Sequence, residues 1–247
     1  MHETIEEGGT RESAGASVLQ RFLGSLGTKL EAPALDVLQR GAVQRRYASG
    51  QTVYFQDDPA HGVHVVAYGC VLLEWRAPDD YLMGFRVASS GDSFGLRSYC
   101  AGEPRSTIAR AVADTLTVFL RGPVLEQAAA LDGRIYRGFA RIVASDAGPK
   151  ISRVTRNGRV PVVVRLAFVV LQLAERLPVS RLGQREHVDF PLQQKDLANL
   201  LDVSQETVSR TMRDLEARNL LRIEHGPREL VILDRAGLAA IAGDYLR

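Results

Sequence analysis

The segment LQQKDLANLLDVSQETVSRTMRDLEARNLLR, from Leu192 to Arg222, has apolar residues at the spacing of two short helices. Asp202 and Val203 form the predicted turn between them. Ser204 is a suitable N-cap for the second helix, because its hydroxyl can accept a backbone N–H of the first turn. The side chains expected to pack between the helices are Leu197, Ala198, Leu201, Val203, Val208, Met212 and Leu215. The pattern therefore predicts a helix-turn-helix.

Polar side chains gather at the N-terminal end of the second predicted helix, where a recognition helix presents residues to base edges. The predicted base-reading residues are Gln205, Glu206, Ser209 and Arg210, and the predicted phosphate contacts are Gln194, Lys195, Ser204, Thr207 and Arg213. An ordinary helical hairpin is the alternative interpretation. Small and branched residues at the packing positions, with Glu, Ser and Arg at one helix end, favour DNA binding.

Two β-like runs follow this pair of helices. Leu220, Leu221 and Ile223 predict one strand, Gly226-Pro227 a turn, and residues 230–233 a second strand, so a two-stranded wing is expected. Residues 178–188 are expected to form a loop or a short strand, after an amphipathic helix over residues 162–177. Asp202 stands where such a turn usually has Gly, and Asp tolerates a left-handed backbone better than most residues.

The composition is that of an ordinary globular protein, with 45% hydrophobic and 24% charged residues. Its formal net charge is only +2. From residue 158 onward there are thirteen Lys and Arg against twelve Asp and Glu. Affinity for phosphate must therefore come from the local placement of basic side chains rather than from a basic domain.

Cysteine content and hydropathy limit the cellular setting. Cys70 and Cys100 are too few for a disulfide framework, and the acidic, polar N-terminus does not resemble a secretory signal. No apolar run is long enough to span a bilayer, since Pro161 and Arg165 interrupt the best candidate. A cytoplasmic location is expected. Cys70 lies in an apolar strand and should be buried, whereas Cys100 should be more exposed.

The N-terminal half changes from a polar tail to β-like runs. Residues 1–16 are predicted to be a mobile tail and residues 17–26 a short helix. Regular short strands broken by Gly, Asp and Pro then predict a β-sandwich or β-roll. The expected strands are residues 52–55, 63–67, 70–75, 83–87, 108–113 and 116–120.

A long apolar stripe of helical spacing follows, from Leu125 to about Arg156. Such a stripe between a β domain and a helix-turn-helix predicts a dimer seam, and a monomeric core helix pair is the alternative. The expected seam residues are Leu131, Ile135, Phe139, Ile142, Val143, Ile151 and Val154. Gly148-Pro149 should kink or restart the helix, because Pro lacks an N–H and clashes with the preceding turn.

In this order of elements, and in the sequence Q-E-T-V-S-R from Gln205 to Arg210, the chain resembles the CRP/FNR family of bacterial transcription regulators. It is most similar to the FNR/FixK branch, whose members read an inverted repeat of TTGA half-sites. The resemblance implies that Glu206 accepts from a cytosine amino group, Arg210 donates to a guanine edge and Ser209 contacts a thymine region. Direct readout agrees, since Arg suits guanine and Glu suits cytosine.

The same resemblance implies an effector pocket in the segment GDSFGLRSYCAGEPRSTIARAV, residues 91–112. The pocket residues would be Gly95, Leu96, Arg105 and Ser106, with Arg105-Ser106 matching a phosphate-contacting pair. The acidic residue that would hold a ribose hydroxyl is replaced by Leu96. The buried hydroxyl would lose a partner at a cost of about 1–3 kcal/mol, so control by a cyclic nucleotide is not expected.

The few cysteines and histidines of the chain limit the metal cofactors and enzymatic activities that it could have. An iron–sulfur oxygen sensor needs four thiolates, and the chain has two cysteines. His61 and His64 are expected to be surface residues, and a haem-based gas sensor stays open as an alternative. A cupin-type metalloenzyme would need a cluster of His and carboxylate ligands that no pattern supplies. No metal or other cofactor is therefore predicted, and no enzymatic activity.

The resulting interpretation is an α+β protein. The expected parts are a tail (1–16), a β-roll resembling a cyclic-nucleotide-binding jelly roll (17–122), a dimerisation helix (123–157) and a winged helix-turn-helix (158–247). The expected function is a homodimeric transcription regulator, an activator with double-stranded DNA and RNA polymerase as partners. An effector-dependent sensor, in which a haem, redox or nucleotide signal in the roll gates DNA binding, is the alternative.

Overall fold

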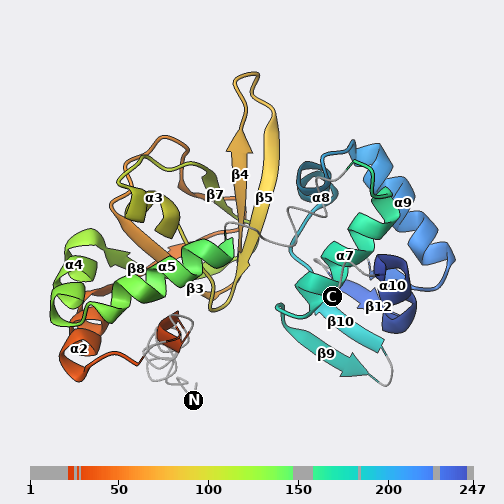
Figure 1. Cartoon of the computed structure of the whole chain (residues 1–247). Coiled ribbons are helices and arrows are strands. Elements are labelled where there is room, and N and C mark those ends of the chain that lie inside the picture. The colour runs from red at the N-terminus through yellow and green to blue at the C-terminus, as the bar shows by residue number, and fades with distance from the viewer. Residues whose placement is uncertain are drawn as a thin grey trace, which may run out of the picture. The chain divides into compact units, whose positions relative to one another are not determined.

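The computed structural model describes residues 22–24, 27, 29–146, 158–182, 185–224 and 229–243. They fall into two compact units, one made of the residues up to 71 with 88–147 and the other of 72–87 with the residues from 148 onward (Figure 1). The predicted tail, the Gly148-Pro149 break, Ile151, Val154 and the Gly226-Pro227 turn lie outside the described residues. None of the helices within these ranges has the length and hydrophobicity needed to cross a bilayer.

The N-terminal half forms a β-roll, as predicted. One sheet has the order β1-β8-β3-β6 and the other the order β2-β7-β4-β5. The strands are β1 (Ala42–Tyr47), β2 (Thr52–Tyr54), β3 (Gly62–Tyr68), β4 (Cys70–Arg76), β5 (Leu82–Ser89), β6 (Ser93–Phe94), β7 (Ile108–Ala111) and β8 (Thr115–Arg121). Strand β8 pairs antiparallel with both β1 and β3, so it lies at the centre of the first sheet.

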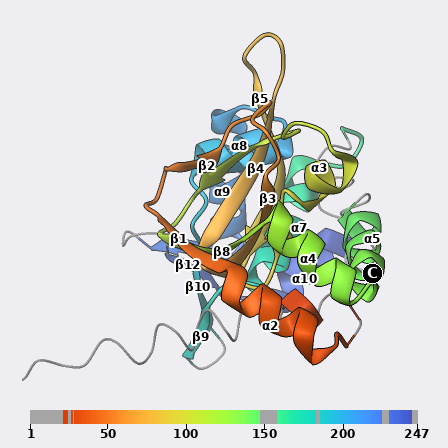
Figure 2. The ribbon, with the colours of Figure 1, turned by 90° about the vertical axis from the view of Figure 1, so that its left-hand side faces the viewer.

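Side chains alternate between two faces of that first sheet, as the pleat of a strand requires. On β3, Val63 and Val65 pack into a hydrophobic core with the surrounding helices, whereas His64 lies on the opposite face. The helices are α2 (Ala32–Gly41), α3 (Leu96–Ala101), α4 (Gly122–Leu131) and α5 (Arg134–Asp146). Helices α2 and α4 lie side by side (Figure 2). The opposite face, which carries His64, is left to line the interior of the roll.

The single long helix predicted from residue 123 is wrong within the described residues, because the chain breaks between α4 and α5. Asp132 ends α4 in an extended conformation. Its carboxylate accepts hydrogen bonds from the backbone N–H of Glu31 at 2.8 Å and from the side chain of Arg134 at 2.8 Å. The hydrogen bond from the Arg134 side chain lowers the pKa of Asp132 most, and the bond from Glu31 lowers it further, so this pKa lies well below its usual range. A tertiary contact therefore interrupts the stripe.

The predicted seam also needs correction. Ile135 and Phe139 are 1% and 2% exposed and belong to the core of their own β-roll unit, so their side chains are not available to a second subunit. Ile142 and Val143 pack partly against the same core. Leu131 alone of the described seam residues is largely exposed, at 52%. Ile135 and Phe139 therefore fit the alternative interpretation, a core helix pair within one subunit, better than they fit a dimer seam.

The C-terminal half contains the predicted helix-turn-helix and a larger sheet than expected. Its helices are α7 (Val162–Ala174), α8 (Gln194–Leu201), α9 (Gln205–Ala217) and α10 (Arg235–Ala242). Its strands, β9 (Val179–Leu182), β10 (Arg185–Asp189), β11 (Leu221–Glu224) and β12 (Glu229–Ile232), form one antiparallel sheet in the order β11-β12-β10-β9. The stretch expected to be a loop or a short strand is thus a strand pair that extends the wing.

Candidate DNA interface and effector cavity

The turn between α8 and α9 has the predicted geometry. Asp202 adopts a left-handed backbone with φ 55°, and the backbone N–H of Val203 donates to the carbonyl of Ala198 at 3.1 Å. Ser204 caps α9, because its hydroxyl accepts the N–H of Thr207 at 3.2 Å. The start of α9 is therefore fixed by the residues that the sequence indicated.

The packing of the two helices is also as predicted. The inward-facing residues Leu197, Ala198, Leu201, Val208, Met212 and Leu215 are buried, and Val203 is half-buried. A capping box that the sequence analysis missed holds the start of α8, where Gln193 and Asp196 exchange side-chain and backbone hydrogen bonds. The spacing of Gln193 and Asp196 was a possible signal, although Gln is an unusual N-cap. The helix pair is thus anchored at both N-termini.

The predicted base-reading residues lie in the N-terminal part of α9. Glu206 and Arg210 are one helical turn apart, and their side chains are 83% and 69% exposed. Nη2 of Arg210 lies 3.4 Å from Oε1 of Glu206, a contact that an exposed pair can give up readily. Gln205 is exposed and Ser209 is half-buried. Of the predicted phosphate contacts, Gln194, Lys195, Ser204 and Arg213 are exposed, and Thr207 is half-buried.

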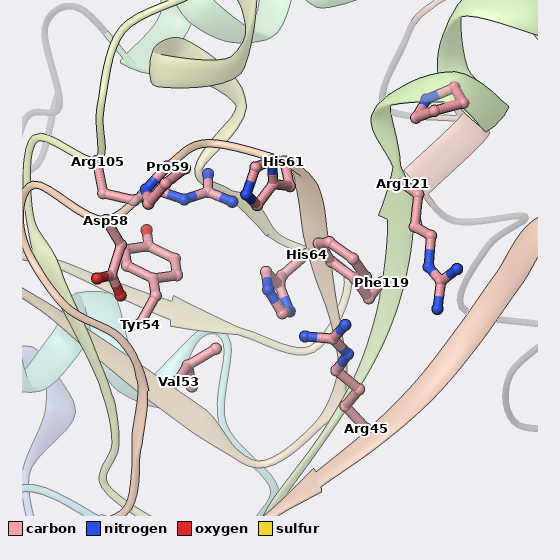
Figure 3. A pocket seen from close by; sticks show the side chains of 11 residues that line it. Arg45, Val53, Tyr54, Asp58, Pro59, His61, His64, Arg105, Phe119 and Arg121 are labelled. Carbon is pink, nitrogen blue, oxygen red and sulfur yellow. The ribbon is translucent and has the colours of Figure 1, made fainter.

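A second feature, in the β-roll unit, is a cavity of about 500 Å³ (Figure 3). Its wall includes Arg45 from β1, Tyr54 from β2, His64 from β3, and Phe119 and Arg121 from β8. Arg105 also lines it. The pocket opens to solvent beside exposed residues such as His61 and Arg121, and its lining includes both cationic and aromatic side chains.

The predicted effector residues take different places around this cavity. Arg105 is 4% exposed and donates to the carbonyls of Gly95 at 2.8 Å and Gly62 at 2.7 Å. Gly95 has φ 79°, and a Cβ there would collide with the guanidinium of Arg105. Leu96 is buried in the hydrophobic core, and Ser106 is exposed. Arg105 therefore belongs to the cavity, whereas Leu96 and Ser106 do not line it.

His64 is not the surface residue that the sequence suggested. It is 2% exposed, its ring stacks on Phe94 with centroids 5.0 Å apart, and its Nδ1 lies 3.2 Å from Oγ1 of Thr117. Burial, together with the positive charges of Arg105 and Arg45, lowers the pKa of His64 to about 3. The ring is therefore neutral near pH 7. His61, by contrast, is exposed, as predicted.

The two cysteines are placed as expected. Cys70 is 1% exposed inside the roll, and Cys100 is exposed on α3. Partial burial raises the pKa of the Cys100 thiol. A reactive thiol needs a lowered pKa, so this environment does not activate Cys100.

One group of possible metal ligands was missed by the sequence analysis. His187, Glu224 and Glu229 lie on three adjacent strands of the wing sheet, with ligand atoms within 4.8 Å of one another. His187 and Glu229 are already hydrogen-bonded to each other. The strand register that brings them together was the missing information.

The fold and the exposed end of α9 define a regulator with a β-roll and a DNA-binding helix-turn-helix, and comparisons with known proteins agree. Residues 44–132 match the cyclic nucleotide-binding domain family, and residues 164–241 match the Crp-like helix-turn-helix domain family. The structure of FixK2 from Bradyrhizobium japonicum has a TM-score of 0.71 at 25% identity, covering 82% of this chain and 98% of that one.

Proteins similar in sequence to this chain are also regulators. The chain is 25% identical over 215 residues to the CRP-like cAMP-activated global transcriptional regulator of Mycobacterium tuberculosis strain H37Rv, covering 85% of this chain and 92% of that protein. It is 26% identical over 218 residues to the nitrogen fixation regulation protein FixK of Bradyrhizobium diazoefficiens, covering 87% of this chain and 88% of that protein. The chain belongs to the CRP/FNR family of transcription regulators, in its FixK-like branch.

Proposed function

We propose that the protein acts in the cytoplasm as a homodimer that reads an inverted repeat with TTGA-like half-sites. The observation that carries this proposal is the exposed pair of Glu206 and Arg210, one turn apart at the N-terminal end of α9. Two such helices related by a twofold axis would enter successive major grooves about 34 Å apart. Arg210 would donate to a guanine edge and Glu206 would accept from a cytosine amino group.

The remaining polar residues of this surface have supporting roles. Gln205 and Ser209 would contact neighbouring bases. Gln194, Lys195, Ser204, Thr207 and Arg213 would bind phosphates and fix the register of the protein without reading sequence. RNA polymerase is the expected protein partner, with activation as the outcome at target promoters.

The dimer surface that we propose is the exposed side of α5, together with Leu131. Tyr136 is 56% exposed, and Ala140 and Ala144 follow it at intervals of four residues. An exposed aromatic residue above two small ones gives an apolar stripe on the outside of the unit. This stripe takes the place of Ile135 and Phe139 in the predicted seam.

The experiment compares Arg210→Ala with Arg213→Ala, two exposed arginines on the same helix. Binding is measured by gel shift on a duplex with two TTGA half-sites and on duplexes with one substituted base pair in each half. Arg210→Ala should weaken specific binding by about 1–3 kcal/mol and relax selectivity at the guanine position. Arg213→Ala should weaken binding to all duplexes alike. Equal losses on every duplex for both variants would remove Arg210 from the reading role.

The cavity in the β-roll favours a second candidate function, a sensor whose bound effector gates DNA binding. The same gel shift without any added small molecule distinguishes the two. Specific binding by protein shown to be ligand-free by native mass spectrometry would support an effector-independent regulator. Binding that appears only with an added effector would support the sensor.

A further inference from the structure

The wing sheet carries one imidazole and two carboxylates on the same face. His187 lies on β10, Glu229 on β12 and Glu224 on β11, which are neighbours in the sheet order β11-β12-β10-β9. Glu224 is the register partner of Glu229. His187 is the partner of Val231, which lies two residues after Glu229 on the same strand. Paired residues of an antiparallel sheet, and residues two apart on one strand, share a face. The register therefore gathers the three side chains.

The possible ligand atoms of these three residues converge. One atom from each residue lies within 4.8 Å of those of the other two. Nδ1 of His187 and a carboxylate oxygen of Glu229 share a hydrogen bond, so these two groups already point at one another. Neighbouring ligand atoms around a zinc ion are about 3–3.5 Å apart. Small rotations of the side chains would thus bring all three onto one ion, which would replace the proton shared by His187 and Glu229.

A row of three carboxylates crosses this face of the sheet. Glu229 lies between its register partners, Glu224 on β11 and Asp189 on β10. Like charges directly opposite one another on neighbouring strands destabilise a sheet. The next row of the same face contributes His187 and Arg222. A cation bound next to Glu229 would offset the repulsion within the row.

The three converging side chains are sheltered from water but not closed off from it. All three residues are half-buried, and the side chains of His187 and Glu229 are 21% and 41% exposed. Val231, the strand partner of His187 on this face, is 1% exposed. Partial burial lessens the competition of water for the ligand atoms. The open side leaves room for water in the remaining coordination positions of an ion.

One imidazole and two carboxylates suit a divalent transition-metal ion such as Zn²⁺, whereas Mg²⁺ and Ca²⁺ prefer oxygen ligands alone. We propose that His187, Glu224 and Glu229 bind one Zn²⁺-like ion. The ion would tie three strands of the wing sheet together and offset two negative charges on the wing. The proposal goes beyond the reading of bases by α9 and does not depend on it, so a failure of one leaves the other intact.

The test is isothermal titration calorimetry on the full-length protein, first freed of metal with EDTA and then transferred to buffer without it. Zinc chloride should bind to one site per chain with a dissociation constant of about 1 μM or below, and magnesium chloride at least about a hundredfold more weakly. Zinc that binds only at millimolar concentrations, or no better than magnesium, would overturn the proposal.

The exposed Cys100 is a possible competing ligand for zinc. Cobalt(II) distinguishes the two cases by its absorption spectrum. A thiolate ligand gives a strong near-ultraviolet charge-transfer band, whereas nitrogen and oxygen ligands give only weak visible bands. The weak bands alone should appear when one equivalent of cobalt is bound. A thiolate band at that point would place the ion at a cysteine and refute the site on the wing.

Two carboxylates of the same row provide a matched pair of variants. Glu224→Gln should weaken zinc binding by at least about tenfold, because it removes a ligand. Asp189→Asn removes an exposed charge from the same face but no proposed ligand, and it should leave the affinity within about threefold. Both positions lie outside the hydrophobic core, so both variants should fold, which circular dichroism checks. Equal losses would indicate a diffuse acidic surface and not a site.

Two histidines test the imidazole in the same way. His187→Asn should also weaken zinc binding by at least about tenfold, whereas His61→Asn, at an exposed position in the β-roll unit, should leave it within about twofold. Unchanged affinity in His187→Asn would remove His187 from the site and overturn the proposal. Glu224→Gln leaves the hydrogen bond between His187 and Glu229 in place, so the test stands even if the His187 variant does not fold.

Discussion

The guanidinium of Arg165, on α7, donates a hydrogen bond at 2.5 Å to the carbonyl oxygen of Leu201, the last residue of α8. Arg165 is 5% exposed, so this bond is buried. The last carbonyls of a helix have no partner within the helix and need one from elsewhere. Arg165 therefore ties the end of the first helix of the helix-turn-helix to the helix that precedes it.

Replacing Arg165 by Met should destabilise the C-terminal unit, because the carbonyl of Leu201 would stay buried without its charged donor. The expected loss in the free energy of unfolding is about 1.5–3 kcal/mol. Urea denaturation, followed by the circular dichroism signal, measures it. Arg165→Lys keeps a positive donor and should lose less. If the Met variant unfolds at the same urea concentration as the wild type, the bond does not stabilise the unit.

A pair of neighbouring residues on α5 distinguishes the core from the outer surface. Ile135 is 1% exposed and Tyr136 is 56% exposed. Ile135→Ala should lower the free energy of unfolding by about 2–5 kcal/mol, because it leaves a cavity in the core. Tyr136→Glu should change stability little but shift the protein from dimer to monomer, since a charge would enter the proposed dimer surface.

Chemical denaturation and sedimentation velocity separate these two effects. Arg137→Glu, at an exposed position one residue further along α5 and therefore about 100° around the helix from the Tyr136 stripe, serves as the control for added negative charge. If Tyr136→Glu sediments as a dimer at the same concentration as the wild type, the subunits meet through another surface.

The sequence was sufficient for the helix-turn-helix because its signals are local. Ser204 caps the helix that begins one residue later, and Asp202 makes the turn within the same few residues. The six predicted strands of the roll end within two residues of the observed ones, because runs of β-branched residues alternate with Gly and Asp, but the sequence analysis missed β1 and β6. Such features depend on neighbours along the chain and not on distant contacts.

The sequence was insufficient where a distant contact decides the structure. The break at Asp132 depends on the backbone N–H of Glu31, a hundred residues earlier. The cavity combines Arg45 and Arg105 from opposite parts of the roll, and no spacing in the sequence brings them together. His64 was misplaced because the run from Val63 to Ala67 is apolar on both faces, which hides the direction in which each side chain points.

The buried His64 should make the β-roll sensitive to acid. Its pKa is about 3 in the folded protein, against 6.5 for an ordinary His. Above pH 6.5 the ring is neutral in both the folded and the unfolded chain. Between pH 6.5 and pH 3 the unfolded chain binds a proton that the folded one does not, so stability falls as the pH falls, with a slope approaching about 1.4 kcal/mol per pH unit.

His64→Phe removes this ionisable group while keeping an aromatic ring between Phe94 and Phe119. The variant should lose some stability at pH 7, because the hydroxyl of Thr117 loses its partner, but its free energy of unfolding should decline less between pH 6.5 and pH 4. Urea denaturation at several pH values measures the difference from the wild type. His61→Asn, a change at an exposed position, should keep the wild-type dependence. Parallel pH profiles for His64→Phe and the wild type would mean that His64 takes up its proton without unfolding.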